Sequence, residues 1–128
     1  MSITFDGTDG IALTTGELTA PRGRGATNTN ATVTGSVTPD MDTYQNFVWT
    51  LTGNVTLGNP SDEAVGQSGN IYLDNSGGHV ISAAATTFIS AADLTKISTA
   101  GKYFVSYYSA DGTNVLVSAS SAVTASGA

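Results

Sequence analysis

Few side chains in this 128-residue chain could do acid–base or metal chemistry. His79 is the only histidine, which excludes a metal site built from several histidines and would rest a Ser-His-Asp arrangement on one residue. The chain has no cysteine, so it offers neither a disulfide nor a thiolate nucleophile. We therefore expect no catalytic residues, no cofactor and no metal, and a protein that is not an enzyme.

The carboxylates give no better starting point for catalysis. Asp6 and Asp9 in "DGTDG" have loosely the spacing of calcium-loop ligands, but the further acidic positions of such a loop are missing. Asp62 and Glu63 are adjacent in a loop with proline and glycine, and we expect both to be solvated. A polysaccharide hydrolase needs two carboxylates that converge across a groove, and no pair in the sequence can be placed in that way.

Aromatic side chains indicate binding rather than reaction. Tyr72 and Tyr108 lie on the opposite parity from their apolar neighbours, so we expect both on an outer sheet face and assign them to partner binding. Exposed tyrosines suit protein interfaces as well as glycans, and the sequence leaves that choice open. Trp49 and Tyr107 follow the apolar parity instead, which predicts that they lie in the core.

The charge balance restricts the kinds of partner. Four basic residues stand against ten acidic ones, and a nucleic-acid surface needs clustered Lys and Arg, so we expect no nucleic-acid partner. Arg22 and Arg24 in "PRGRG" make up half of the basic residues, and we assign them to binding acidic groups of a protein partner. No run is long enough to cross a bilayer and no signal peptide is visible, so we expect no membrane partner and synthesis in a cytoplasm.

The elements that position these residues are predicted to be short strands. Thr, Ala, Gly, Ser and Asn dominate the composition, which favours strands with many turns and disfavours long helices. One helical turn is predicted at "SAADLTKIS", where Ser90 and Asp93 form a variant capping box. Alternation predicts strands over residues 31–38, 45–57, 69–74, 79–83, 86–90, 102–108 and 114–120.

This pattern predicts an all-β fold, an antiparallel β-sandwich or jelly-roll-like barrel with an extended N-terminal arm. We divide the chain into an arm over residues 1–30, a β-sandwich domain over residues 31–120 and a C-terminal tail over residues 121–128. A frayed terminus fits residues 1–30 as well as an arm does. Large apolar residues are scarce, so we expect further apolar burial between subunits of a homo-oligomer.

Two local patterns predict strand pairing in more detail. In "FVWTLTGNVTL" five apolar residues share one parity, namely Phe47, Trp49, Leu51, Val55 and Leu57. The strand should therefore continue through Gly53 with a bend or bulge rather than turn there as a hairpin. In "YFVSYYSADGTNVLVSAS" a three-residue loop over residues 110–112, with Gly112 left-handed, would pair Ser109 with Thr113 and Tyr107 with Val115.

Three segments carry a resemblance to a known family. "NFVWTLTGNVTLGNP", "AVGQSGNIYLDNSGG" and "KYFVSYYSADGTNVLVSAS" resemble a β-domain common in structural proteins of tailed bacteriophages, over roughly residues 45–120. The resemblance implies a symmetric virion component, with a trimer favoured, that assembles in the host cytoplasm.

Two positions in the particle are open under this resemblance. The first is a capsid decoration or cement protein that binds the major capsid protein and stabilises the head. The alternative is a tail-fibre or tail-tip module that binds host-surface glycans. The short chain, with no coiled-coil or triple-helical segment, favours the head.

Overall fold

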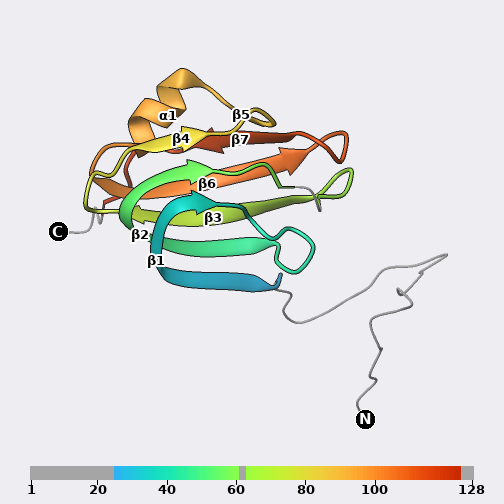
Figure 1. Cartoon of the computed structure of the whole chain (residues 1–128), viewed down its shortest axis with the longest axis horizontal. Helices are drawn as coiled ribbons and strands as arrows, with labels where there is room; N and C mark the ends of the chain where they lie inside the picture. Colours follow the sequence, from blue (N-terminus) through green and yellow to red (C-terminus); the bar gives the residue numbers. More distant parts are fainter. Residues whose placement is uncertain (1–24, 61–62, 125–128) are drawn as a thin grey trace, which may run out of the picture.

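The computed structural model describes residues 25–60 and 63–124. The predicted all-β class is confirmed, since these ranges hold seven strands and a single short helix (Figure 1). The elements are β1 (Thr27–Val37), β2 (Asn46–Leu57), β3 (Ser68–Asn75), β4 (Ile81–Ala83), β5 (Thr87–Ile89), α1 (Ala91–Ile97), β6 (Gly101–Ser109) and β7 (Val115–Ala119).

The ends of the chain depart from the predicted division. β1 begins at Thr27, so the last part of the range 1–30 assigned to the arm belongs to the sheet. Residues 1–24, with Arg22 and Arg24, lie outside the described residues, as do residues 125–128 of the predicted tail. The helix is confirmed where the sequence placed it, because the Ser90 side chain accepts a hydrogen bond of 3.0 Å from the Asp93 amide.

The strands form a mixed, open sheet rather than an antiparallel one. Its order is β1-β2-β3-β6-β7-β5, with β4 paired to the C-terminal half of β2. β3, β6 and β7 pair antiparallel, but β1–β2, β2–β3, β2–β4 and β5–β7 all pair parallel. The antiparallel prediction was therefore wrong, since an alternating pattern fixes which face a side chain takes and not the direction of the neighbouring strand.

β1 and β2 are curved so strongly that each returns toward the side on which it began (Figure 1). β2 pairs with β3 through residues 46–50 and with β4 through residues 55–57, while β1 follows it on the other side. These strands form three curved units that run parallel, and we call each unit a coil: β1 is the first coil, β2 the second, and β3 with β4 the third. The curvature lets residues 38–45 join two parallel neighbours, although such a crossover normally takes a dozen or more residues.

β2 passes through Gly53 as predicted, and between Thr50 and Val55 its partner changes from β3 to β4. Thr34 of the first coil lies directly against this glycine, so a Cβ at position 53 would collide with the Thr34 hydroxyl oxygen. A residue without a side chain is therefore required where the two curved strands approach each other.

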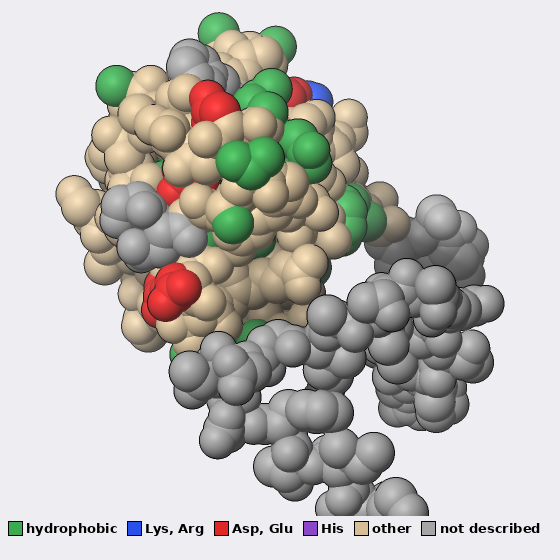
Figure 2. Space-filling view, turned by 90° about the vertical axis from the view of Figure 1, so that its right-hand side faces the viewer, with side chains coloured by type: hydrophobic (Ala, Val, Ile, Leu, Met, Phe, Trp, Pro, Cys, Tyr) green, Lys and Arg blue, Asp and Glu red, His purple; other side chains and the backbone are tan. Residues whose placement is uncertain are grey.

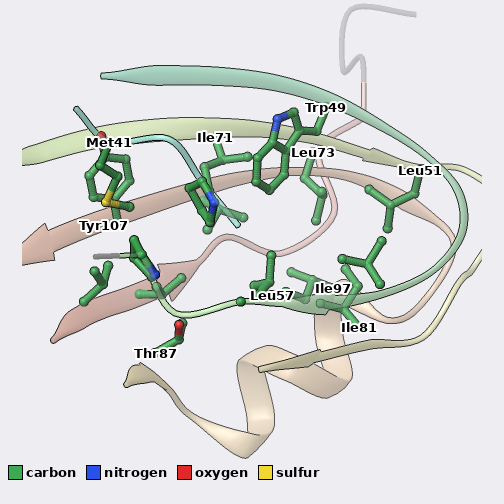
Figure 3. A pocket seen from close by; sticks show the side chains of 17 residues that line it. Met41, Trp49, Leu51, Leu57, Ile71, Leu73, Ile81, Thr87, Ile97 and Tyr107 are labelled. Carbon is green, nitrogen blue, oxygen red and sulfur yellow. The ribbon is translucent and has the colours of Figure 1, made fainter. Parts of the chain in front are cut away.

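The core lies inside the coils (Figure 3). Phe47, Trp49, Leu51 and Val55 of β2 are all buried, which confirms the face assigned from their alternation. Trp49, Leu51 and Val55 line an apolar cavity of about 30 Å³. The other buried apolar residues are Val33, Met41, Ile71, Leu73, Ile81, Ile97, Tyr103, Val105, Tyr107, Val115 and Ala119.

The β6–β7 hairpin has a longer loop than predicted. Ser109 pairs with Val115 and Tyr107 pairs with Val117, so the loop covers residues 110–114. The predicted register was wrong by two residues, which keeps every side chain on its predicted face. The cause is Asp111, whose carboxylate accepts hydrogen bonds from the amides of Thr113 at 2.9 Å and Asn114 at 2.8 Å and so keeps both in the loop. Gly112 has the predicted left-handed conformation, with φ of 71°.

Three carboxylates of the domain accept hydrogen bonds that lower their pKa below the usual range. The largest causes are the Ser76 hydroxyl for Asp74, the Lys96 ammonium for Asp93 and the Asn114 amide for Asp111. The Ser76 bond joins a turn to the end of β3, the Lys96 bond lies within α1, and the Asn114 bond lies within the β6–β7 loop, so protonation would loosen the segments that connect the strands.

We expect stability to fall in acid. A carboxyl group with a lowered folded pKa contributes stability that is fully present above its unfolded pKa of about 3.9 and is lost as pH falls through the folded value. Urea unfolding should therefore show a free energy that declines below about pH 5. The decline should be shallower in Asp111→Asn than in the unchanged chain, because that carboxyl pKa is lowered on folding. Thr113→Ala keeps the backbone donor to Asp111, so its free energy of unfolding should fall with pH as steeply as that of the unchanged chain. An equally steep fall in Asp111→Asn would contradict the stabilising role of the Asp111 carboxylate.

Candidate binding face

The exposed large apolar residues of the sheet gather on the convex side of β3, β6 and β7. Tyr72 and Tyr108 are exposed there, at 41% and 50%, as their parity predicted. Phe104 and Leu116, each 51% exposed, lie on the same face. We call Tyr72, Phe104, Tyr108 and Leu116 the outer aromatic face.

Strand pairing arranges this face in rows. Tyr72 lies directly opposite Phe104, and Tyr108 lies opposite Leu116, so each pair has its Cβ atoms about 4.5–5.5 Å apart. A polar row lies between the two apolar rows, where the Ser106 hydroxyl donates to Asn70 Oδ1 at 3.2 Å. The face thus offers two apolar strips that flank a strip of amide and hydroxyl groups.

The sequence produces this face by strict alternation along β6. Tyr103, Val105 and Tyr107 point inward and are buried, so Phe104 and Tyr108 must point outward. The sequence reasoning considered only tyrosines and tryptophan and therefore missed Phe104. The signal was present, because Phe104 shares the parity of Tyr108.

The outer aromatic face is bounded by one ion pair and is otherwise weakly charged. Lys102 Nζ lies 3.3 Å from Asp74 Oδ2, one row beyond Tyr72 and Phe104. The Asp74 carboxylate, followed by Tyr72, raises the pKa of Lys102, so the ammonium stays charged at neutral pH. Because the two charges of this ion pair offset each other, the pair favours neither an anionic nor a cationic partner. A partner would therefore be recognised by the apolar rows and the polar row.

The remaining candidates from the sequence do not join this face. Asp6, Asp9 and Asp62 lie outside the described residues. Glu63 is only 7% exposed, and neither of its carboxylate oxygens has a hydrogen-bond partner, so the prediction that it is solvated was wrong. The Gly66 amide donates to the Ser109 carbonyl at 2.7 Å and so folds this loop against β6.

His79 serves the fold through its main chain. Its amide donates to Asn75 Oδ1 and its carbonyl accepts from Asn75 Nδ2, both at 2.8 Å. Within residues 25–60 and 63–124, no three His, Asp or Glu side chains gather as a metal site would require, and no helix has the length and apolar character to span a membrane. Figure 2 shows only scattered charged side chains on the end of the domain that it faces.

The chain matches no family model, no curated protein and no solved structure. The case for its function therefore depends on the geometry of the outer aromatic face and on the resemblance in the sequence.

Proposed function

We propose that the chain is a non-catalytic structural protein of a tailed bacteriophage, located in the virion, that binds the outer capsid surface as a decoration or cement protein and stabilises the head. The observation that carries the proposal is the outer aromatic face. Tyr72, Phe104 and Tyr108 are exposed on two strands that are each hydrogen-bonded on both sides, β3 between β2 and β6, and β6 between β3 and β7. Rigid aromatic side chains give a large contact area at a low entropic cost, as attachment to another protein requires.

The partner in this proposal is the major capsid protein. Arg22 and Arg24 stand close before β1 in the sequence, where they would supply charge-assisted hydrogen bonds to acidic groups of the capsid. Phage particles persist outside the cell, and a cysteine-free β domain suits that condition because its stability needs no particular redox state. A homo-oligomer would multiply these contacts across the capsid.

The proposal also includes a two-layered, sandwich-like domain. One layer consists of the N-terminal halves of β1 and β2 together with β3, β6 and β7. The other layer consists of the C-terminal halves of β1 and β2 together with β4. Trp49 and Ile71 from the first layer and Val55 and Ile81 from the second belong to a single core cluster, which supports this description.

A tail-fibre or tail-tip module that binds host glycans is the second candidate, favoured by the polar row. The Asn70 amide and Ser106 hydroxyl lie between aromatic rows, an arrangement that could hold a sugar ring by stacking and hydrogen bonding together. The copy number per virion separates the two positions. A number comparable with that of the major capsid protein indicates decoration, whereas a few copies indicate a tail.

Removing the outer aromatic face should weaken attachment. We expect Phe104→Ser with Tyr108→Ser to bind undecorated capsids at least about tenfold more weakly than the unchanged chain in co-sedimentation, since aromatic anchors dominate binding energy. Both side chains are half exposed, so the variant should remain folded.

Val80→Ser is the matched control. Val80 is 58% exposed but lies before β4, away from the outer aromatic face, and this variant should bind as the unchanged chain does. Repeating the assay at several salt concentrations isolates the contribution of Arg22 and Arg24, which should weaken with salt. Full-strength binding by the folded double variant would reject the outer aromatic face as the attachment surface.

A further inference from the structure

The first coil has one long unpaired edge. β1 extends over 11 residues and, within residues 25–60 and 63–124, pairs with β2 on one side only. A strand edge presents unpaired N–H and C=O groups that can pair with another strand. At the opposite end of the strand order, β5 has only three residues, as does β4 beside it, so the exposed edges there are short.

The usual protection of an edge strand is incomplete in β1. The strand "TNTNATVTGSV" contains no lysine, no other charged residue and no proline. Its protection is limited to irregularities in its pairing with β2, which fall after Asn30 and around Val33. Residues Thr27–Asn30 before them pair evenly with β2, and Thr27, Thr29 and Asn30 are exposed. A regular, neutral segment is therefore free to accept a further strand.

The coils are covered at one end and uncovered at the other. β6 pairs along the whole of β3 and so covers that part of the third coil, whereas no strand of the described residues covers the first coil. Stacked repeats need a terminal layer that is polar or covered. The inner side of the first coil is polar near this end, where Asn28 Oδ1 accepts a hydrogen bond of 3.3 Å from Trp49 Nε1. These polar side chains cover the end of the core, but they do not pair with the backbone groups at the edge of β1.

We propose that β1 is a self-association surface on which the β1 strand of a second copy pairs antiparallel about a two-fold axis. Charge favours a second copy as the occupant. The chain carries a formal charge of −6, yet residues 25–39 and 43–60, which include both β1 and β2, contain no charged residue. Two copies can therefore approach through this side without placing like charges together. The proposal does not depend on capsid binding.

Continuous outer faces in both copies require the two-fold axis to pass through a residue, and we place it at Thr29, an exposed residue inside the regular segment Thr27–Asn30. Opposite residues in a pair share a face, so an axis through Thr29 places Thr29 opposite Thr29 of the second copy and Asn28 opposite Asn30 of the second copy. The regular segment is short, so the dimer should lie at the weak end of interface sizes. Identical edges pair two by two, and the trimer implied by the resemblance would need contacts outside β1.

The test changes Thr29 to lysine in the full chain. Thr29→Lys places two ammonium groups opposite each other at the axis and should raise the dimer dissociation constant by about tenfold or more in sedimentation equilibrium. Thr95→Lys is the matched control, because Thr95 is exposed on α1 and the variant gains the same charge. An added positive charge lowers the general repulsion between acidic chains, so Thr95→Lys should leave the dimer unchanged or slightly tighter.

The expected result is a concentration-dependent dimer that Thr29→Lys disrupts and Thr95→Lys does not. A monomer at all concentrations, a trimer, or equal effects of the two variants would each overturn the proposal. A dimer that appears only after removal of residues 1–24 would also overturn it, because the edge would then be occupied by the chain's own N-terminal residues. Capsid co-sedimentation of Thr29→Lys is read separately, so a failure of the proposed attachment is not mistaken for a failure of pairing.

Discussion

Trp49→Ala is expected to lower the free energy of unfolding by about 3–5 kcal/mol, a large share of the stability of a domain of this size. Trp49 is 3% exposed and packs against Phe47 with ring centroids 5.2 Å apart. It lines the cavity inside the coils together with Leu51 and Leu73, so truncation would enlarge that cavity (Figure 3). Its indole N–H also donates to Asn28 of the first coil, so the change separates two coils as well as emptying the core.

Two further variants make this prediction specific. Trp49→Phe keeps most of the ring and loses the hydrogen bond to Asn28. It should therefore lower the free energy of unfolding by only about 1–2 kcal/mol, the usual cost of one lost hydrogen bond and a partial truncation. Phe104→Ala removes a ring of similar size from the outer aromatic face and should cost much less. Urea unfolding followed by far-ultraviolet circular dichroism is the measurement, since Trp49 is the only tryptophan and its fluorescence is lost. A midpoint for Trp49→Ala that matches the unchanged chain would show that the face assignment is wrong.

Asn75→Ala is expected to cost about 3 kcal/mol or more, because it leaves one buried and two partly buried backbone groups without their partner. Asn75 ends β3 and has no exposed surface. Its amide nitrogen donates to the carbonyls of His79 at 2.8 Å and Ile97 at 2.7 Å, and its oxygen accepts from the His79 amide at 2.8 Å. One side chain thus connects the third coil, the turn that leads to β4 and the end of α1.

Asn75→Asp tests the same bonds with almost no change in shape. The carboxylate would face two carbonyl oxygens that it cannot bind, so the loss of stability at pH 7 should equal or exceed that of Asn75→Ala. Protonation restores one donor, so the deficit relative to the unchanged chain should shrink as pH falls. Asn70→Ala is the control on the same strand, since Asn70 is exposed and should cost under about 0.5 kcal/mol. A deficit of Asn75→Asp that is independent of pH would contradict the proposed bonds.

The sequence predicted the sheet face of each side chain better than it predicted which strands pair and in which direction. Alternation placed Trp49 inside and Tyr72 and Tyr108 outside, and it continued β2 through Gly53, because parity decides which side of a strand a residue occupies. The same parity is compatible with a parallel or an antiparallel neighbour. A connection as short as residues 38–45 normally joins antiparallel strands, and only the curvature of β1 and β2 makes it compatible with their parallel pairing.

Specific contacts account for two of the other differences. The hairpin loop was predicted too short because the Asp111 carboxylate binds two amides that the pattern assigned to the strand. Glu63 is buried because its loop folds onto Ser109, far away in the sequence. Phe104 could have been assigned to the outer aromatic face from its parity alone. The uncovered first coil could not have been foreseen, since it depends on which strand ends the sheet.

The single-sided pairing of β1 also has a mechanical consequence. Tension applied through residue 25 would load the hydrogen bonds between β1 and β2 one after another, because β1 is held by one neighbour only. β6 is held by both β3 and β7, and several of its bonds would have to break together under the same pull. The chain should therefore yield first at its N-terminal strand while β3, β6 and β7 stay paired, so that a partner pulling on that end would extend the molecule before unfolding the rest of the sheet.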